Sequence, residues 1–275
     1  MICAWKQLLS VLPPEIESQA DRIGEETIQE LRLRLDAPAE MITDSGSIWL
    51  NGTVKQDSLN YVVNAASRYS PWCASTMSKG YITAPGGHRI GICGDAVFHS
   101  DKPGSFQKIT SLCIRVARDF PGIADNILET DNSILIVGAP GWGKTTLLRD
   151  LARRIAMDSV VCVVDEREEL YPDGIQRGKR MDVLRGFPKA QGMDMVLRTM
   201  GPDYIAVDEI TAQTDCDGLM RAANCGVKLL ATVHASGMQD LKRRELYLSL
   251  LDRKVFQIIV LLRRDKSFCL ERVVS

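Results

Sequence analysis

Nine consecutive residues have the types and order that bind phosphate groups. The first eight fit the pattern G-x-x-x-x-G-K-[ST], and the nine lie between the apolar run Ile134–Val137 and the helix-favouring run Leu147–Ala152. Glycines let the backbone curl around a triphosphate, and amide groups at the start of a helix point at its oxygens. The sequence therefore predicts a phosphate-binding loop between a strand and a helix, formed by Gly138, Ala139, Pro140, Gly141, Trp142, Gly143, Lys144, Thr145 and Thr146.

Two side chains of this loop have expected roles in binding a nucleotide. Lys144 would neutralise the β- and γ-phosphates, and Thr145 would bind Mg²⁺ through its hydroxyl group. The alternative is a glycine-rich turn before an ordinary helix, but the full motif with its flanks favours nucleotide binding. The sequence has no N-K-x-D guanine-specificity motif, so ATP with Mg²⁺ is expected rather than GTP.

A pair of acidic residues follows the apolar run Tyr204–Val207. In open α/β sheets, ligands bind at the carboxyl ends of the strands, so this pair should face the loop. Asp208 would hold Mg²⁺ directly or through water, and Glu209 would orient or deprotonate the attacking water. Without the loop, the same pair would indicate only a solvated turn. After the loop it is the expected hydrolytic partner.

Two further strand ends carry polar residues. The acidic segment Asp165–Glu169 also follows an apolar run, so Glu166 competes with Glu209 for the role of activating water, and the sequence leaves that choice open. His234 could donate a hydrogen bond to the γ-phosphate or to the attacking water. Its alternative is a structural loop histidine, and we expect a structural role for His88, which lacks metal-like spacing.

Composition excludes several classes of protein. The 275 residues include 34 basic and 35 acidic side chains, a net charge of −1 that gives no argument for non-specific nucleic-acid binding. The longest apolar runs, Ile134–Val137 and Val255–Leu262, are far shorter than the roughly 20 residues of a spanning helix. The first residues lack the apolar core of a signal peptide, so a cytosolic protein is expected. The eight cysteines form no C-x-x-C pair, and we expect most, including Cys93 and Cys162, to fill the core.

The pattern of elements predicts two domains. Residues 1–120 mix helical signals at Pro13–Leu35 and Leu59–Tyr69 with strands at Tyr81–Val97 and Thr110–Val116, which is typical of a small α+β domain. A linker is expected at Arg118–Gly122. Residues 121–275 alternate β-rich and helical runs and predict an α/β domain with a parallel sheet covered on both faces. The β-rich runs are Ile134–Val137, Val160–Val164, Tyr204–Val207, Leu229–Val233 and Phe256–Leu262.

The order of these motifs resembles the secretion ATPases of type II and type IV systems. In that family, the features that match Asp165–Glu169, Leu197–Glu209 and Ala222–Ala235 are called the Asp box, the Walker B strand and the His box. The segments Gly86–Gly94 and Ile109–Arg118 resemble a sporulation branch of the family. The resemblance implies a RecA-like P-loop ATPase core behind a smaller N-terminal α+β domain.

The same resemblance implies partners and a place in the cell. It implies a homo-oligomeric ring of six subunits and a membrane-embedded channel or secretion complex as partner in sporulating cells. The expected function is Mg²⁺-dependent ATP hydrolysis that powers or assembles a trans-envelope channel from the mother-cell side. The protein would be cytoplasmic and peripheral to the membrane, attached through that complex.

Arginines should complete such a site, because developing charge on the γ-phosphate must be stabilised, often by a neighbouring subunit. By resemblance the candidates are Arg89, Arg115 and Arg118 in the first domain and Arg198 before the Walker B strand. Surface solvation or pairing within the domain is the alternative for each.

Two other function classes stay open. A nucleic-acid motor could share this core, although the sequence has no OB-fold pattern, basic domain or aromatic stacking series. A nucleotide-gated scaffold that hydrolyses very slowly is the other.

Overall fold

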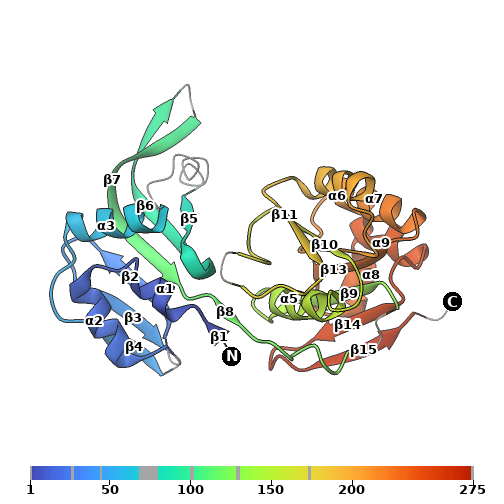
Figure 1. Cartoon of the computed structure of the whole chain (residues 1–275), viewed down its shortest axis with the longest axis horizontal. Coiled ribbons are helices and arrows are strands. Elements are labelled where there is room, and N and C mark those ends of the chain that lie inside the picture. The colour runs from blue at the N-terminus through green and yellow to red at the C-terminus, as the bar shows by residue number, and fades with distance from the viewer. Residues whose placement is uncertain are drawn as a thin grey trace. The chain divides into compact units, whose positions relative to one another are not determined.

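The chain divides into two units, each of which is described by itself. The computed structural model describes residues 2–25, 28–43, 45–67, 80–99, 102–127, 131–172 and 175–273. Unit 1 comprises Met1–Asp119 with Pro172–Ile175, and unit 2 comprises Phe120–Tyr171 with Gln176–Ser275. Figure 1 shows the helices and strands of each unit.

A seven-stranded sheet forms the centre of unit 2 in the part of the chain that the structure describes. Its order is β11-β10-β12-β13-β9-β14-β15, and every neighbouring pair is parallel except β14 and β15. The strands β9, β10 and β12 are buried along their whole length, as expected where helices cover both faces of a sheet. The strands are β9 (Ile134–Gly138), β10 (Val161–Asp165), β11 (Met181–Arg185), β12 (Tyr204–Val207), β13 (Lys228–His234), β14 (Ile258–Leu262) and β15 (Phe268–Arg272).

Helices cover the two faces of this sheet. On one face, alternate strand residues such as Leu135, Ile205 and Ala231 form a buried cluster with side chains of the helices after β11, β12 and β13. The first helix of the unit packs against β9 and β13 and contributes nothing to that cluster, so it covers the other face. The helices are α5 (Lys144–Ile155), α6 (Lys189–Thr199), α7 (Gln213–Asn224), α8 (Met238–Arg243) and α9 (Glu245–Asp252).

The predicted fold class is confirmed, and all five predicted runs of the second domain form strands. Sequence analysis missed β11 and β15, which lie at the two edges of the sheet. Edge strands face solvent on more sides, so they carry polar residues such as Asp182 and Glu271 and lack the continuous apolar pattern of central strands.

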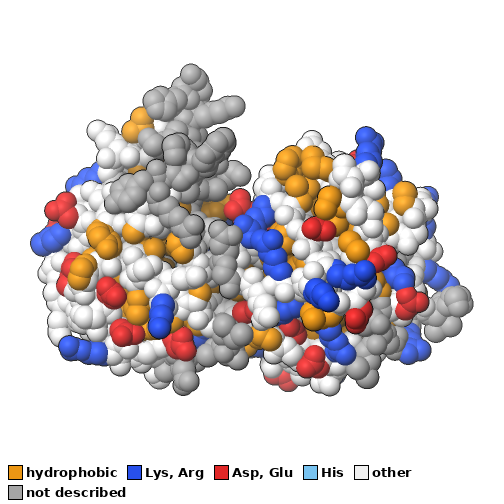
Figure 2. Space-filling model, viewed as in Figure 1, with side chains coloured by type: hydrophobic (Ala, Val, Ile, Leu, Met, Phe, Trp, Pro, Cys, Tyr) orange, Lys and Arg blue, Asp and Glu red, His pale blue; other side chains and the backbone are white. Residues whose placement is uncertain are grey.

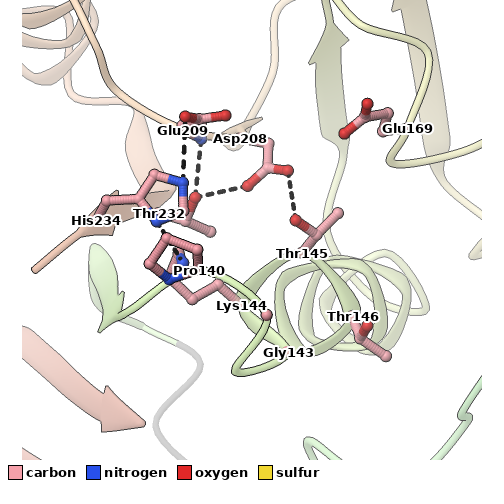
Figure 3. A pocket seen from close by; sticks show the side chains of 11 residues that line it. Pro140, Gly143, Lys144, Thr145, Thr146, Glu169, Asp208, Glu209, Thr232 and His234 are labelled. Carbon is pink, nitrogen blue, oxygen red and sulfur yellow. Dashed lines mark hydrogen bonds and ion pairs between the residues drawn. The ribbon is translucent and has the colours of Figure 1, made fainter. Parts of the chain in front are cut away.

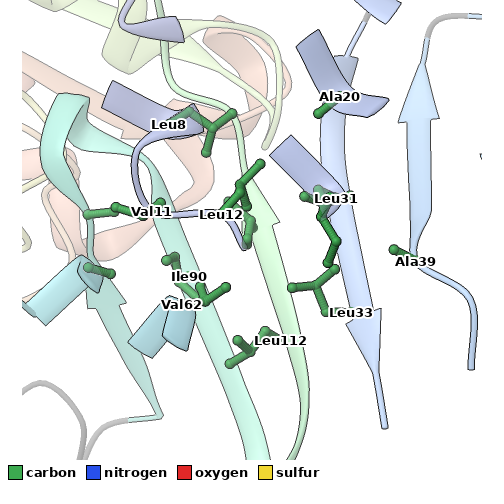
Figure 4. Packing of buried hydrophobic residues seen from close by; sticks show 14 of the residues in the cluster. Leu8, Val11, Leu12, Ala20, Leu31, Leu33, Ala39, Val62, Ile90 and Leu112 are labelled. Carbon is green, nitrogen blue, oxygen red and sulfur yellow. The ribbon is translucent and has the colours of Figure 1, made fainter. Parts of the chain in front are cut away.

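Unit 1 contains a six-stranded antiparallel sheet among its described residues, in the order β4-β3-β2-β7-β6-β5. One apolar core joins the sheet to the helices, with Leu8 and Leu12 from the N-terminal segment packed near Leu31 and Ile90 (Figure 4). The elements are α1 (Trp5–Leu9), α2 (Pro14–Ile23), β2 (Ile28–Arg34), β3 (Glu40–Thr43), β4 (Gly46–Trp49), α3 (Gln56–Ser67), β5 (Tyr81–Thr83), the 3-10 turn η2 (Pro85–Gly87), β6 (Arg89–His99) and β7 (Lys102–Arg115).

The prediction of helical structure through Leu35 is wrong in its second half. Helix α2 ends at Gly24, whose φ of 87° terminates the helix, and Ile28–Arg34 forms strand β2. The alternation of apolar and polar residues there has period two, and Leu31 and Leu33 are buried on one face of the sheet. The second predicted helix is α3, but its predicted end at Tyr69 lies outside the described residues.

Two other predictions from the sequence differ from the structure. The first two of the five residues of the predicted linker form strand β8 (Arg118–Asp119), which pairs with β1 (Ile2–Cys3). Cys162 is buried as predicted, but Cys93 is exposed on β6, where it alternates away from the core. Across the described ranges, no helix has both the length and the apolar character needed to cross a membrane.

A buried histidine connects the first and last chain segments of unit 1. His88 has no exposed surface, its Nδ1 accepts the Ala117 amide at 3.1 Å, and its Nε2 lies 3.1 Å from the Ala4 carbonyl. The ring must be neutral with the proton on Nε2, because Nδ1 accepts and a carbonyl cannot donate. Burial lowers the pKa of His88 below 6.5, the ordinary value for histidine.

We expect His88 to make the stability of unit 1 depend on pH. The unfolded chain binds this proton more readily than the folded one, so the contribution is complete above pH 6.5 and decreases as the pH falls below it. Chemical unfolding of the native protein and of His88→Gln, followed by tryptophan fluorescence between pH 5 and 8, should give a difference that shrinks by at most about 1.4 kcal/mol per pH unit below that value. Parallel stability curves would contradict this assignment.

Candidate phosphate-binding site

The predicted loop has the backbone that a phosphate cradle requires. Gly141 and Gly143 have φ of 77° and 99°, in the left-handed region that residues with a Cβ atom rarely adopt. Space is limited at Gly138, because a Cβ there would lie 3.1 Å from that of Leu262, a tight contact that disfavours a larger residue. Gly143 is the N-cap of α5, so the free amide groups of the helix's first turn face the loop.

A pocket of about 350 Å³ opens beside this loop, at the carboxyl ends of β9, β12 and β13 (Figure 3). The sequence-predicted residues of three separate segments therefore meet in one place, as the topology of a parallel sheet requires. The lining comprises Pro140, Gly141, Gly143, Lys144, Thr145, Thr146, Glu169, Asp208, Glu209, Thr232 and His234.

Lys144 is held inside this pocket by two acceptors. Its Nζ lies 3.0 Å from the Ala139 carbonyl oxygen and 2.8 Å from Nδ1 of His234, and the side chain is only 5% exposed. Burial lowers the pKa of Lys144, while the carboxylates of Asp208 and Glu209 act in the opposite direction. An ammonium group only donates, so Nδ1 of His234 is the acceptor and its proton lies on Nε2.

Asp208 joins the loop to the neighbouring strand. One carboxylate oxygen accepts the Thr145 hydroxyl at 2.7 Å, and the other accepts the hydroxyl of Thr232 at 2.5 Å. Thr232 is fully buried, and its oxygen also accepts the backbone amide of Glu209 at 2.8 Å. Sequence analysis did not single out Thr232, since a threonine in a strand is an ordinary β-forming residue.

Glu209 is held from both its backbone and its side chain. Its φ of 53° is left-handed, a conformation that the hydrogen bond from its backbone amide to the Thr232 hydroxyl oxygen maintains. One carboxylate oxygen lies 3.1 Å from Nε2 of His234, and the other pairs with the guanidinium group of Arg167. Arg167 comes from the acidic segment after β10 and is another residue that sequence analysis missed, because four acids surround it.

The acidic segment after β10 places Glu169, and not Glu166, in the pocket. The buried Asp165 carboxylate accepts the amides of Glu169, Leu170 and Tyr171 at 2.9–3.0 Å and so shapes the turn. In Figure 3, Glu169 lies on the far side of Asp208 and Thr145 from Glu209.

Glu166 points to a different part of the domain. Its carboxylate pairs at 2.8 Å with the buried Lys189 ammonium at the start of α6, which also lies 3.7 Å from Asp215. A buried lysine needs such partners, so Glu166 has a structural task and does not line the pocket. Sequence analysis considered only Glu166 and Glu209 for the role of activating water, and did not consider Glu169.

The oxygen atoms at this site suit a hard cation such as Mg²⁺. The Thr145 hydroxyl and the Asp208 carboxylate lie 2.7 Å apart at the same end of the pocket. In the described part of the chain, no three His, Cys, Asp or Glu side chains gather into a group that could hold a metal ion. A magnesium ion would therefore need phosphate oxygens and water as further ligands, which is its usual mode of binding.

The predicted arginines are not among the side chains that line this pocket. Arg198 is in the last turn of α6, at the opposite edge of the sheet from the pocket, because β12 begins six residues later and runs toward Asp208. Arg89 and Arg115 are cross-strand neighbours on β6 and β7 of unit 1. Arg118 donates to the backbone carbonyl groups of Glu25 and Ile28, a structural role.

Known proteins with a similar sequence place this chain in a family. The sequence model of the family described as "Sporulation stage III, protein AA" matches residues 6–270. The Bacillus subtilis (strain 168) protein named "Stage III sporulation protein AA" is 33% identical over an alignment that covers 95% of this chain and 92% of that one.

Two solved structures have a similar fold. The pilus retraction motor PilT, solved with bound ADP, has a TM-score of 0.65 and 17% identity over 90% of this chain and 77% of PilT. The Legionella pneumophila ATPase DotB has a TM-score of 0.61 and 19% identity over 90% of this chain and 76% of DotB. At these identities the likeness concerns the fold.

Proposed function

The chain belongs to the sporulation stage III protein AA family, and on this premise we propose that it is a Mg²⁺-dependent ATPase. The observation that carries the proposal is the convergence of four side chains on one pocket: Lys144, Thr145, Asp208 and Glu209. A cationic donor, two oxygen ligands for Mg²⁺ and a carboxylate for water are the parts that phosphoryl transfer requires. The fold shared with PilT and DotB supports the same chemistry.

Binding of a triphosphate would change the partners of Lys144. Its present acceptors, the Ala139 carbonyl and Nδ1 of His234, are neutral, and phosphate oxygens are stronger acceptors because they are charged. His234 Nδ1 would then lose its donor while Nε2 still faces Glu209. His234 would therefore report the presence of the γ-phosphate to the carboxylate that handles water.

Glu209 is the carboxylate that we assign to the attacking water. It lines the pocket beside Asp208, and its fixed backbone keeps the side chain at the strand end. Arg167 neutralises it in the present arrangement, and we assign Arg167 the role of holding this carboxylate until a nucleotide enters. Glu169 is the second carboxylate that could reach water, and bound Mg²⁺ would supply positive charge for the phosphate oxygens.

We further propose that the active form is a ring of six subunits. Arg89 and Arg115 face each other across β6 and β7, and Glu30 of β2 lies opposite Arg115. Two like charges directly opposite in a sheet are unfavourable, so the pair suggests a task outside unit 1. Arg115 is 71% exposed and lies 3.8 Å from Glu30, while Arg89 stacks 4.3 Å above the ring of Tyr81.

The biological setting is proposed from the family. A membrane-embedded channel or secretion complex of sporulating cells is the proposed partner, with this protein on the cytoplasmic, mother-cell side. On the face drawn in Figure 2, basic and acidic side chains are interspersed, which does not support a nucleic-acid motor. ATP turnover with and without the membrane partner would separate a motor from a slow nucleotide-gated scaffold.

We expect Lys144→Ala to lower ATP hydrolysis by at least about a hundredfold, because charge-assisted bonds to the phosphates are lost. The measurement is phosphate release at saturating Mg²⁺. The matched control is Lys242→Ala, which removes an exposed lysine of α8 and should leave turnover unchanged. Near-native turnover in a Lys144→Ala protein with an unchanged circular dichroism spectrum would reject the proposed ATPase.

The three carboxylates should differ in single-turnover experiments. Glu209→Gln should keep ATP binding but slow hydrolysis by about a hundredfold or more, as expected for loss of the group that handles water. Glu169→Gln should also slow hydrolysis, whereas Glu166→Gln should change the rate less than about tenfold and mainly lower stability. A larger rate loss in Glu166→Gln than in Glu209→Gln would transfer the role to Glu166.

Turnover per subunit should increase with protein concentration if a neighbouring arginine completes the site. Arg115→Ala or Arg89→Ala should then lower kcat more than it raises KM, since the contact forms mainly in the transition state. Sedimentation at each concentration checks the oligomeric state. Full activity in dilute monomer, unaffected by both substitutions, would exclude the shared site.

A further inference from the structure

The helix that follows the phosphate-binding loop carries a buried arginine with no role in the function proposed above. Arg149 lies in α5 and is 8% exposed. Its Nε donates to the Leu170 carbonyl oxygen at 2.5 Å, and its Nη2 donates to the Glu169 carbonyl oxygen at 2.8 Å. The Arg149 carbonyl oxygen in turn accepts the hydroxyl group of the fully buried Tyr171. One residue of the helix therefore contacts three consecutive residues of the segment that carries Glu169.

The buried Asp165 carboxylate binds the same segment through its amide groups. It accepts the amides of Glu169 and Leu170 at 2.9 and 3.0 Å, and Arg149 donates to the carbonyl groups of the same two residues. All four backbone polar groups of these residues are therefore bonded to charged side chains, which form stronger hydrogen bonds than neutral ones. The backbone of Glu169 is fixed as long as both partners stay in place.

The position of Arg149 in α5 relates this segment to the phosphate-binding loop. Arg149 follows Thr145 by four residues, and residues at this spacing lie on the same face of an α-helix. The Thr145 hydroxyl donates to Asp208, and Glu169 lines the same pocket (Figure 3). One turn of helix therefore separates the residue that binds Asp208 from the residue that holds the backbone of Glu169.

A guanidinium group is well suited to hold this segment. Its donors form a planar fork, so the side chain of Arg149 fixes two neighbouring carbonyl groups in one geometry. A buried charge is unfavourable unless it is well bonded, and here the bonds go to the backbone of Glu169 and Leu170. Arg153, one turn further along α5, is buried to the same degree, but its guanidinium group pairs at 2.8 Å with Asp150 of the same helix.

We propose that Arg149 is a positioning residue for ATP hydrolysis, and that it acts through Glu169 by holding the backbone of that residue beside Thr145 and Asp208. The inference rests on the proposed function, because it concerns the rate of the same reaction. A displacement of about 1 Å at a reacting group can cost about a hundredfold in rate. Arg149 is not among the residues that line the pocket, so its loss should affect hydrolysis more than ATP binding.

A double-mutant cycle between Arg149 and Glu169 tests this inference. Single-turnover hydrolysis of Mg²⁺-bound ATP is measured for the full chain as the native protein, Arg149→Met, Glu169→Gln and the double variant. Arg149→Met should lower the rate by about tenfold or more and change the dissociation constant of ATP by less than about threefold. In the Glu169→Gln background, the same substitution should lower the rate by less than about twofold, because the carboxylate that it positions is already lost.

Two further variants separate positioning from stability. Arg149→Lys keeps the charge but lacks the planar fork, so its rate should lie between those of Arg149→Met and the native protein. The matched control Arg153→Met removes the other buried arginine and should lower stability, with less than about a twofold change in the rate of the folded protein. If Arg149→Met does not fold, Arg149→Lys completes the same cycle.

Equal losses of rate from Arg149→Met in the native and Glu169→Gln backgrounds would overturn the proposal. A native rate in Glu169→Gln would also overturn it, since Arg149 would then have no group to act through. Both results leave the proposed ATPase in place, because that proposal is tested at Lys144. A native protein that hydrolyses no ATP would instead contradict the proposed function, and this inference with it.

Discussion

The Asp208 carboxylate holds the candidate site together. One oxygen accepts from Thr145 in the first turn of α5, and the other accepts from Thr232 in β13. Three segments, far apart in the sequence, are therefore fixed at the edge of the sheet by one side chain at the end of β12. Thr232 extends this constraint, because its hydroxyl also fixes the left-handed backbone of Glu209. The proposed cation ligands and the carboxylate proposed to handle water thus have a common rigid support.

A connected series of hydrogen bonds and ion pairs runs along the pocket and makes the burial of Lys144 tolerable. Lys144 donates to His234, His234 faces Glu209, and Glu209 pairs with Arg167. A buried ammonium group without such partners would be strongly unfavourable. Because Lys144 already has these partners, a triphosphate would have to replace them when it binds. Under the proposed function, nucleotide binding would therefore be coupled to the positions of His234 and Glu209 through Lys144.

Unit 1 positions its charged side chains in a different way from unit 2. Its antiparallel sheet alternates buried and exposed residues, so Leu31 and Leu33 build the core while Glu30 and Arg32 face away from it. The alternation leaves Arg89 and Arg115 side by side on β6 and β7. A sheet with one solvated face can present charged side chains in fixed positions, whereas the parallel sheet of unit 2 must place its polar groups at strand ends.

The sequence by itself determined the five central strands, the loop Gly138–Thr146 between a strand and a helix, and the places of Asp208 and Glu209 at a strand end. These follow from local pattern: glycine positions, apolar runs, and the rule that parallel strands deliver their ends to one edge. It failed at Ile28–Arg34, where a period of two was read as helix, and at the half-exposed edge strands β11 and β15.

Only the tertiary structure decided which acidic side chain after β10 faces the pocket. Asp165 caps the turn and Lys189 attracts Glu166 toward α6, which leaves Glu169 at the pocket. A second pocket of unit 2 is lined by Phe120, Trp142 and Phe268, which no local pattern in the sequence relates. The apolar pattern of a strand shows where the strand ends. The direction of a side chain in the loop that follows depends on partners that folding brings from distant parts of the chain.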